Sequence, residues 1–464
     1  MKYNKLIILG VALLVFASNQ LPFLLDMRPV MYDEPWYMNP AFNLIHGNGL
    51  HNTLVGSGGN VNFIAPLLMA GAMKILGESL LTVRLVAVIC GFASIFILHF
   101  IMNELECHGL SRVFGYGIFL SISIINSTFR YVRPEFAAAL FVLLGILFTL
   151  RYHRSRSLKD IIGISVSIYL ASCSHPYSLY LFALIGCSLL YNIIKTKEWR
   201  QLYHMLILII TAGLVVITLV TMNKIVNDAE TSNGIMNRFS MGNAIEAMVV
   251  SMKHVFIKHG VYTIPFLLVQ AYVAIKYKTL RWITIPNLIF IFTFPLLFST
   301  DLAMVGNSVL YYSLLSIVVC CMVIKDWFCQ FNISNKRQSI LLILCIVFCI
   351  FNWGISTTFN YIKRYEKCNS ILAKEIDFIV PDNSLVFGSI RFWPFKMNST
   401  YYCDHNGMEN IPTEYDYLIL SSVDEQLFQD TELMKRIEDS KEKYKTIYTR
   451  NTKQYGTITI WRHL

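Results

Sequence analysis

The stretch Arg28-Pro-Val-Met-Tyr-Asp-Glu-Pro-Trp-Tyr37 places two adjacent carboxylates, Asp33 and Glu34, directly after the first long apolar run of the chain. A carboxylate at a lipid boundary among aromatic side chains is partly desolvated, so it can be tuned as a base or used to meet a cation. The structural alternative is a pair of solvated acids in an interfacial loop beside an aromatic belt. The remainder of the sequence favours a functional role for the two carboxylates.

The composition is that of a polytopic membrane protein. Of the 464 residues, 55% are hydrophobic and 15% are charged, whereas soluble domains carry about 25% charged residues. The mean hydropathy is +0.51, and the apolar runs of roughly 17–22 residues are long enough to cross a bilayer. We predict about eleven spans, at residues 5–25, 85–102, 111–127, 134–150, 160–174, 176–194, 204–222, 260–275, 282–299, 305–324 and 339–357.

The basic residues lie between the apolar runs and predict the orientation of the chain. With the N-terminus inside, the predicted inner loops hold Arg151, Arg154, Arg156, Lys159, Lys195, Lys197, Arg200, Lys276, Lys278, Arg281, Lys325, Lys336 and Arg337. The short predicted outer loops near 174–177 and 299–306 hold no lysine or arginine. We therefore expect Asp33, Glu34 and the C-terminal tail to face outward, and the net charge of +10 to reflect topology and not nucleic-acid binding.

The chain is expected to divide into a transmembrane domain, residues 1–358, and an extracytoplasmic α/β domain, residues 359–464. Within the first, residues 26–84 form a predicted outer loop with interfacial or re-entrant helices at 35–46 and 63–76. In the second, the patterns predict helices and strands. The predicted helices are 363–379 and 424–442, and the predicted strands are 384–387, 417–420, 445–450 and 456–461, the last two joined as a hairpin.

The N-terminal apolar run also fits a cleaved signal peptide with a cleavage site after Ala17. We expect an uncleaved anchor, because Asp33 follows so closely and a catalytic loop gains from a fixed origin. Of the eleven cysteines, most fall in or beside apolar spans, where cysteine behaves as a small hydrophobe. Cys368 and Cys403 lie in the outward region, and the sequence leaves their pairing open because no spacing rule supports it.

Four polar sets gather at the predicted outer ends of the spans, where polar groups next to lipid are costly and therefore informative. They are Asp33-Glu34, Arg130-Tyr-Val-Arg-Pro-Glu135, Ser174-His-Pro-Tyr177, and 299–307 followed by Tyr311-Tyr312. Each set alone fits a satisfied helix end or a structural ion pair, such as Arg133 with Glu135. Their joint occurrence on one side of the membrane favours an active site.

The motifs in this order resemble family 39-like GT-C glycosyltransferases, which include protein O-mannosyltransferases and the aminoarabinose transferase of lipid A. Asp33-Glu-Pro-Trp-Tyr37 followed by Ala41 is similar to their DE-x-x-Y-x-x-x-A opening. Similar stretches are Asn62-Phe-Ile-Ala-Pro-Leu67, Leu76-Gly-Glu-Ser79, Val83-Arg-Leu85, Arg133-Pro-Glu135 and Ser174-His-Pro176. The likeness covers residues 5–200 well and the later spans mainly through topology. One departure is a single proline, Pro66, where the family has two.

The resemblance implies a GT-C-like fold, a polyprenyl-phosphate-linked sugar as donor, a site at the outer membrane boundary of a bacterial inner or plasma membrane, and inversion at the anomeric carbon. Residue chemistry agrees: Asp33 can act as the base. Arginine binds phosphate in a bidentate manner, so Arg84, Arg130 or Arg133 is expected to meet the leaving phosphate. Glu34 is expected to orient an arginine or hold a divalent cation, and metal dependence is left open. The expected substrate-binding residues are Tyr37, Arg84, Arg130, Arg133, Glu135, His175 and Tyr311.

Two other functions remain open at this point. Many helices with intramembrane charges also fit a transporter or flippase of lipid-linked glycans, although such proteins often show two similar halves that this sequence lacks. An inactive member of an envelope-assembly complex is the third interpretation, against which the intact Asp33-Glu34 pair argues. The identities of the sugar and of the acceptor, which can be a glycan, a lipid or a protein hydroxyl, are not encoded in these motifs.

Overall fold

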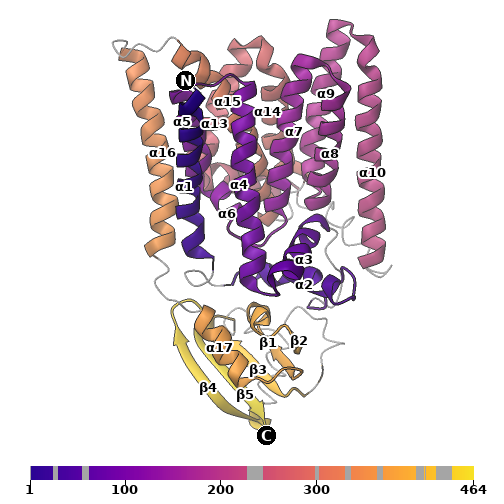
Figure 1. The fold of residues 1–464 in the computed structure, drawn as a ribbon, viewed down its shortest axis with the longest axis vertical. Coiled ribbons are helices and arrows are strands. Elements are labelled where there is room, and N and C mark those ends of the chain that lie inside the picture. Colours follow the sequence, from indigo (N-terminus) through magenta and orange to yellow (C-terminus); the bar gives the residue numbers. More distant parts are fainter. Residues whose placement is uncertain are drawn as a thin grey trace.

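A helical bundle carries a small α/β domain at one end (Figure 1). The computed structural model describes residues 2–24, 30–54, 62–226, 244–297, 302–329, 336–362, 369–403, 412, 414–424 and 441–464. The helices of the bundle region are α1 (Lys2–Gln20), α2 (Asp33–Ile45), α3 (Ile64–Leu76), α4 (Leu80–Glu104), α5 (Leu110–Ser121), α6 (Ser123–Thr128), α7 (Glu135–Ser155), α8 (Leu158–Ser174), α9 (Ser178–Thr196), α10 (Leu202–Val226), α12 (Ala244–Lys253), α13 (Gly260–Lys276), α14 (Arg281–Leu297), α15 (Leu302–Cys329) and α16 (Lys336–Ile362).

Every predicted span overlaps one of these helices, because long apolar runs can satisfy their backbone in lipid only as helices. The predicted span 111–127 differs: Ile122 is extended and divides it into α5 and α6. Five described helices are long and apolar enough to cross a membrane: Leu80–Glu104, Glu135–Ser155, Ser178–Thr196, Leu202–Ile225 and Ser308–Trp327. The chain is thus an integral membrane protein, and the count of about eleven spans stays a prediction.

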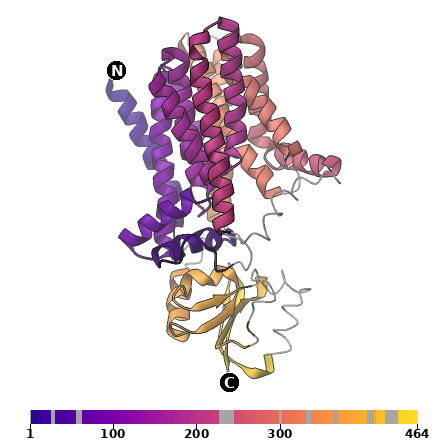
Figure 2. The ribbon, with the colours of Figure 1, turned by 90° about the vertical axis from the view of Figure 1, so that its right-hand side faces the viewer.

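Helices α2 and α3 pack against each other across the end of the bundle that faces the α/β domain (Figures 1 and 2). Helix α2 begins two residues before the predicted helix at 35–46, so Asp33 and Glu34 lie in its first turn. A helix N-terminus favours carboxylates there, and proline is tolerated at Pro35 because first-turn amides need no intrahelical partner.

The turn between α3 and α4 sets the direction of α4. Gly77 has φ +93°, a conformation that residues with a Cβ rarely adopt. Two residues later, the Ser79 hydroxyl accepts a hydrogen bond from the Thr82 amide and caps α4. This sharp, capped turn aims the first turns of α4, which carry Arg84, back toward α2.

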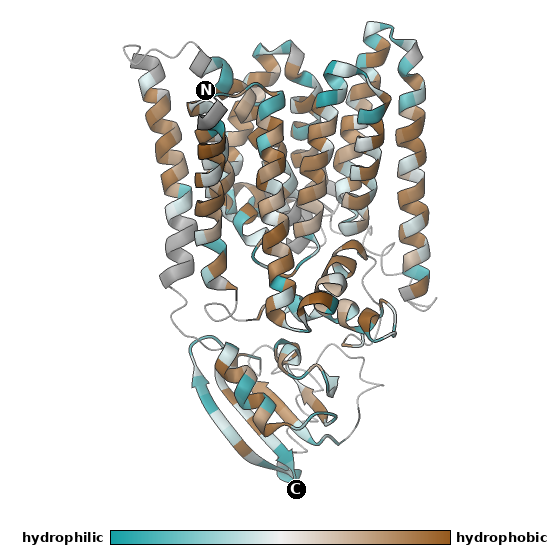
Figure 3. Ribbon diagram, viewed as in Figure 1, coloured by the Kyte–Doolittle hydropathy of each residue, from teal (hydrophilic) through white to brown (hydrophobic). Residues whose placement is uncertain are grey.

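Apolar residues cover the bundle, and polar residues gather at its ends and over the α/β domain (Figure 3). Ion pairs join the loops at the end away from the α/β domain. They are Arg151–Glu104 at 2.9 Å, Lys325–Glu106 at 3.1 Å and Arg156–Glu198 at 3.3 Å. Basic residues from different predicted inner loops therefore do lie at one end of the bundle, with the N-terminus (Figure 1).

Which side of the membrane this end faces is a prediction that cysteine labelling tests. We expect an impermeant maleimide to label a Lys445→Cys variant in intact cells and a Lys159→Cys variant only after permeabilisation. Both positions are exposed in the structure, so accessibility reports the side of the membrane. The unsubstituted protein measures labelling of its own cysteines. Labelling at 159 without labelling at 445 in intact cells would reverse the orientation.

The C-terminal domain is a five-stranded sheet with order β2-β1-β3-β5-β4. Its elements are α17 (Asn369–Ile379), β1 (Leu385–Gly388), the 3₁₀ helix η7 (Ile390–Phe395), β2 (Thr400–Tyr402), β3 (Tyr417–Ser421), β4 (Tyr444–Thr452) and β5 (Gly456–His463). Strand β1 pairs in parallel with β2 and β3, and β5 pairs antiparallel with β3 and β4. All four predicted strands are present, whereas β2 was not predicted. Residues 363–368 and 425–440, where two helices were expected to begin and to lie, are outside the described residues.

Strands β4 and β5 form the predicted hairpin. Gly456 has φ +69°, and a Cβ there would lie 2.2 Å from the Ser422 hydroxyl oxygen, so this turn position needs glycine. The preceding residue, Tyr455, is fully buried and belongs to one hydrophobic cluster that continues from the bundle into the sheet. The α/β domain therefore packs on the bundle with its hairpin turn inward.

Candidate active site

Glu34 and Arg84 form a fully buried ion pair at the end of the bundle. Arg84 Nε donates to Glu34 Oε1 at 3.0 Å and Arg84 Nη2 donates to Oε2 at 2.7 Å, and both side chains have no exposed surface. The carboxylate also accepts the amide of Met31 at 2.9 Å and that of Val132 at 3.3 Å. This geometry is bidentate and charge-assisted, so its hydrogen bonds are stronger than those between neutral groups.

The pair fixes four segments relative to one another. Arg84 Nη1 donates to the Leu24 carbonyl at 2.9 Å, so the pair reaches the chain leaving α1 as well as α2, α4 and the α6–α7 turn. Of the two roles expected for Glu34, orienting an arginine is the one visible in these contacts. Arg84, expected at the donor phosphate, is buried under this carboxylate.

Asp33 points into a different environment from its neighbour. Its side chain is 46% exposed, and Arg133 Nε lies 3.5 Å from Oδ2. The same guanidinium, 31% exposed, reaches Glu135 Oε1 with Nη2 at 3.0 Å. Glu135 is the first residue of α7 and is buried, and its Oε2 has no hydrogen-bond partner among the described residues. Asp33, Arg133 and Glu135 thus form a series that runs from solvent to a buried carboxylate oxygen.

His175 and Tyr311 extend this series into the bundle. The Tyr311 hydroxyl lies 2.7 Å from His175 Nδ1, and both side chains are buried. Burial lowers the pKa of His175 to about 4; the Glu135 carboxylate opposes this shift and the Arg133 guanidinium adds to it. His175 is therefore neutral at pH 7, with its ring held in place by Tyr311.

Arg130 and Tyr37 are the two remaining predicted residues. Arg130 donates from Nε to Gln20 Oε1 at 3.2 Å and from Nη2 to the Asn19 carbonyl at 2.9 Å, so it binds the C-terminal end of α1. Tyr37 lies one turn after Asp33 in α2 and packs half-buried against the core. Residues 299–301 of the fourth polar set are outside the described residues.

The whole chain superposes on two crystal structures of ArnT from Cupriavidus metallidurans. The apo structure matches with a TM-score of 0.64 at 10% identity, covering 98% of this chain and 97% of that chain. The structure bound to undecaprenyl phosphate matches with a TM-score of 0.59 at 11% identity over the same shares. This chain has the GT-C fold of ArnT. The fold expected from the Asp33-Glu34 motif is confirmed. No family model matches the chain, and no curated protein does.

A metal site does not emerge from the described part of this GT-C fold. Within it, no three His, Cys, Asp or Glu side chains gather as metal ligands do. Glu34, for which cation binding was one of two expected roles, directs both oxygens at Arg84. Cys403 donates its thiol to the Leu54 carbonyl at 2.9 Å, and Cys368, with which a disulfide was left open, is outside the described residues.

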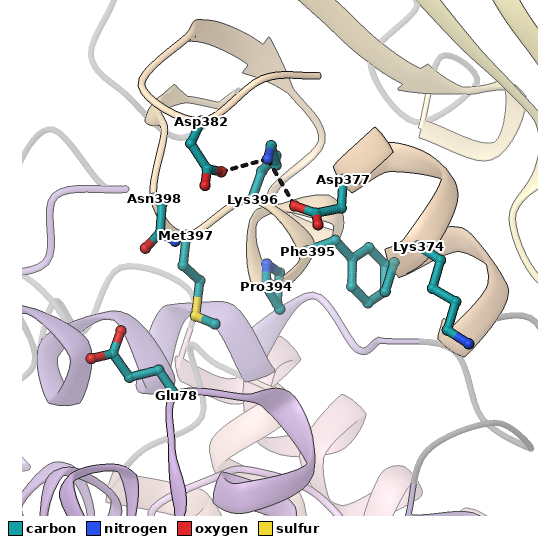
Figure 4. A pocket seen from close by; sticks show the side chains of 10 residues that line it. Glu78, Lys374, Asp377, Asp382, Pro394, Phe395, Lys396, Met397 and Asn398 are labelled. Carbon is teal, nitrogen blue, oxygen red and sulfur yellow. Dashed lines mark hydrogen bonds and ion pairs between the residues drawn. The ribbon is translucent and has the colours of Figure 1, made fainter. Parts of the chain in front are cut away.

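An open cleft of about 340 Å³ lies between the C-terminal domain and the α3–α4 turn (Figure 4). In it the buried Lys396 ammonium donates to Asp377 at 2.9 Å and to Asp382 at 2.6 Å. Glu78 faces these residues from the bundle side. The residues that line this cleft do not include the predicted site residues, so the cleft is separate from the Asp33 series.

Four groups near the site were not foreseen from the sequence. Met31 and Val132 contribute backbone amides to Glu34. Arg391 and Tyr455 of the C-terminal domain lie against the chain just before Asp33. Any residue except proline can supply a backbone amide, so the residue types of Met31 and Val132 do not indicate their role. Tyr455 lies 425 positions from Val30, so no local sequence pattern indicates this contact.

Proposed function

We propose that this GT-C protein transfers a sugar from a polyprenyl-phosphate-linked donor to an extracytoplasmic acceptor hydroxyl, with inversion at the anomeric carbon. The observation that carries the proposal is the Asp33–Arg133–Glu135 series at the end of a bundle whose fold matches a structure bound to undecaprenyl phosphate. A likeness of 11% identity supports the fold, and the chemistry rests on these three side chains.

Asp33 is the proposed base because its carboxylate is 46% exposed and so accessible to an acceptor hydroxyl. It takes the proton of the acceptor hydroxyl as the oxygen attacks the anomeric carbon. The bond from this carbon to the phosphate oxygen breaks on the opposite face, so the configuration inverts. Both electrons of the broken bond leave with the polyprenyl phosphate.

Arg133 is the proposed phosphate ligand among the three arginines. It pairs with Asp33 and Glu135 and is partly exposed, whereas Arg84 and Arg130 are buried. A guanidinium matches two phosphate oxygens at once and stabilises the charge that develops on the leaving group. Glu135 Oε2 is buried and has no hydrogen-bond partner among the described residues. We propose that it accepts a hydrogen bond from a sugar hydroxyl.

The proposal is tested with purified protein in lipid nanodiscs and defined polyprenyl-phosphate sugars. We expect release of polyprenyl phosphate with transfer of the sugar, and no transfer from a polyprenyl sugar that lacks the phosphate. Tail burial gains about 0.8 kcal/mol per CH₂ relative to water, and a membrane-dissolved donor already has this gain. Shortening the prenyl chain therefore changes the apparent affinity only modestly.

Two results would contradict the proposal. Efficient use of a nucleotide sugar would show that the site does not require a polyprenyl-phosphate donor. Movement of a lipid-linked glycan across the bilayer of liposomes, with the sugar–phosphate bond intact, would favour the transporter. The Asp33→Asn variant in nanodiscs provides the background for the transfer measurement, and liposomes without protein provide it for the transport measurement.

A further inference from the structure

The C-terminal domain contacts the segment that carries Asp33, and the hairpin turn makes the first contact. The amide of Val30 donates to the Tyr455 hydroxyl oxygen at 2.7 Å, and this hydroxyl donates to Asn369 Oδ1 at 2.8 Å. Val30 and Tyr455 are both buried. One oxygen of the sheet domain therefore satisfies the backbone three residues before Asp33 and is itself oriented by α17.

Arg391 makes the second contact, from η7. Its guanidinium carbon lies 5.3 Å from the centre of the Tyr32 ring, within the range of a cation–π interaction. Asp424, three residues after the end of β3, is buried, and its Oδ1 lies 3.6 Å from Nη1 of the same guanidinium. Tyr32 is the N-cap of α2 and immediately precedes Asp33.

Two further contacts reach the same segment, residues 30–54. The Trp393 ring of η7 packs edge-on against Phe42 of α2, with ring centres 5.6 Å apart. The Cys403 thiol donates to the Leu54 carbonyl. The domain thus holds the segment near its start, in the middle of α2 and near its end, from three different elements.

We propose that the C-terminal domain positions the candidate active site, and that Tyr455 and Arg391 hold the backbone that presents Asp33 to the acceptor. This inference rests on the proposed function for its effect on turnover. Both residues act through Val30 and Tyr32, so we treat them as positioning residues. Small displacements of a reacting group are costly: about 1 Å can lower a rate 10²-fold.

The test compares three substitutions in the full-length protein in nanodiscs. Tyr455→Phe removes one oxygen, Arg391→Ala removes the cation over Tyr32, and Arg450→Ala is the matched control. Arg450 lies in the same domain and is ion-paired with Glu375 of α17. We expect kcat to fall roughly 10- to 100-fold in the first two variants, with the donor KM unchanged. Arg391→Lys keeps a cation over the ring and is expected to recover part of kcat.

Hydrogen–deuterium exchange of peptides covering residues 30–37 provides a readout independent of transfer. We expect faster exchange in Tyr455→Phe, where the Val30 amide loses its acceptor, and wild-type exchange in Arg450→Ala. Unchanged exchange, unchanged kcat, or an equal loss in Arg450→Ala would each overturn the inference. If the wild-type protein transfers no sugar, the proposed function fails, whereas the exchange difference still decides whether the domain holds this segment.

Discussion

Replacing Asp33 by asparagine is expected to lower kcat by roughly 10²–10⁴-fold, the usual contribution of a positioned general base. The amide keeps the shape of the side chain and loses the basic oxygen. Because Asp33 is 46% exposed and lies 3.5 Å from Arg133, the substitution leaves no charge buried. We therefore expect normal membrane insertion and an unchanged melting temperature. Release of polyprenyl phosphate from the defined donor measures the effect.

The matched control for this prediction is Glu78→Gln. Glu78 is an acid on the same end of the bundle, where it pairs with His46 at 3.1 Å, outside the Asp33 series. We expect its loss to leave kcat within about twofold, since an exposed ion pair is worth little. A well-folded Asp33→Asn variant that retained near-wild-type transfer would exclude Asp33 as the base.

Replacing Arg84 by alanine is expected to destabilise the protein by about 3–5 kcal/mol, because the change leaves Glu34 as a buried charge without its partner. The backbone amides of Met31 and Val132 would remain around the carboxylate but cannot neutralise it. The effect is measured as a lower unfolding temperature of the purified protein. Unfolding is detected as the loss of the monodisperse peak on heating. A similar loss of stability is expected of Glu34→Ala.

Two companion variants make this prediction specific. Lys325→Ala removes an ion pair with Glu106 that is partly exposed, and its cost is expected to stay below about 1 kcal/mol. Replacing Glu34 by leucine together with Arg84 by methionine removes both charges and is expected to recover much of the lost stability. Wild-type unfolding of Arg84→Ala would show that the buried pair does not hold the four segments together.

The fold could be predicted from the sequence where a structural pattern is continuous along the chain. A run of apolar residues dictates a helix in lipid, so the positions of α4, α7 and α15 follow directly from the composition. Strand β2 escaped prediction because Thr400–Tyr402 is only three residues long, and its strand conformation depends on pairing with β1. The start of α2 shifted by two residues because helix ends depend on capping contacts that the pattern of apolar residues does not encode.

The candidate site could be predicted from the sequence only in part, for a different reason. Topology alone indicated that Asp33, Arg133 and Glu135 belong to one end of the bundle. The sequence could not distinguish Arg133, which is partly exposed, from Arg84 and Arg130, which are buried, because burial of a side chain is decided by distant packing. The contact of the C-terminal domain with this segment was not predictable for the same reason, since Tyr455 and Val30 are 425 positions apart.

The spacing of the buried ion pair along the chain has a consequence for biosynthesis. Glu34 lies 50 positions before Arg84 and 98 before Val132. At a synthesis rate of 5–20 residues per second, the carboxylate emerges about 3–10 s before its guanidinium partner. Over that interval Glu34 has to stay hydrated, and α2 cannot settle in its final place until α4 has entered the membrane. The Glu34–Arg84 pair can therefore form while most of the chain is still to be made, whereas Tyr455, which contacts Val30, is synthesised 425 positions after it.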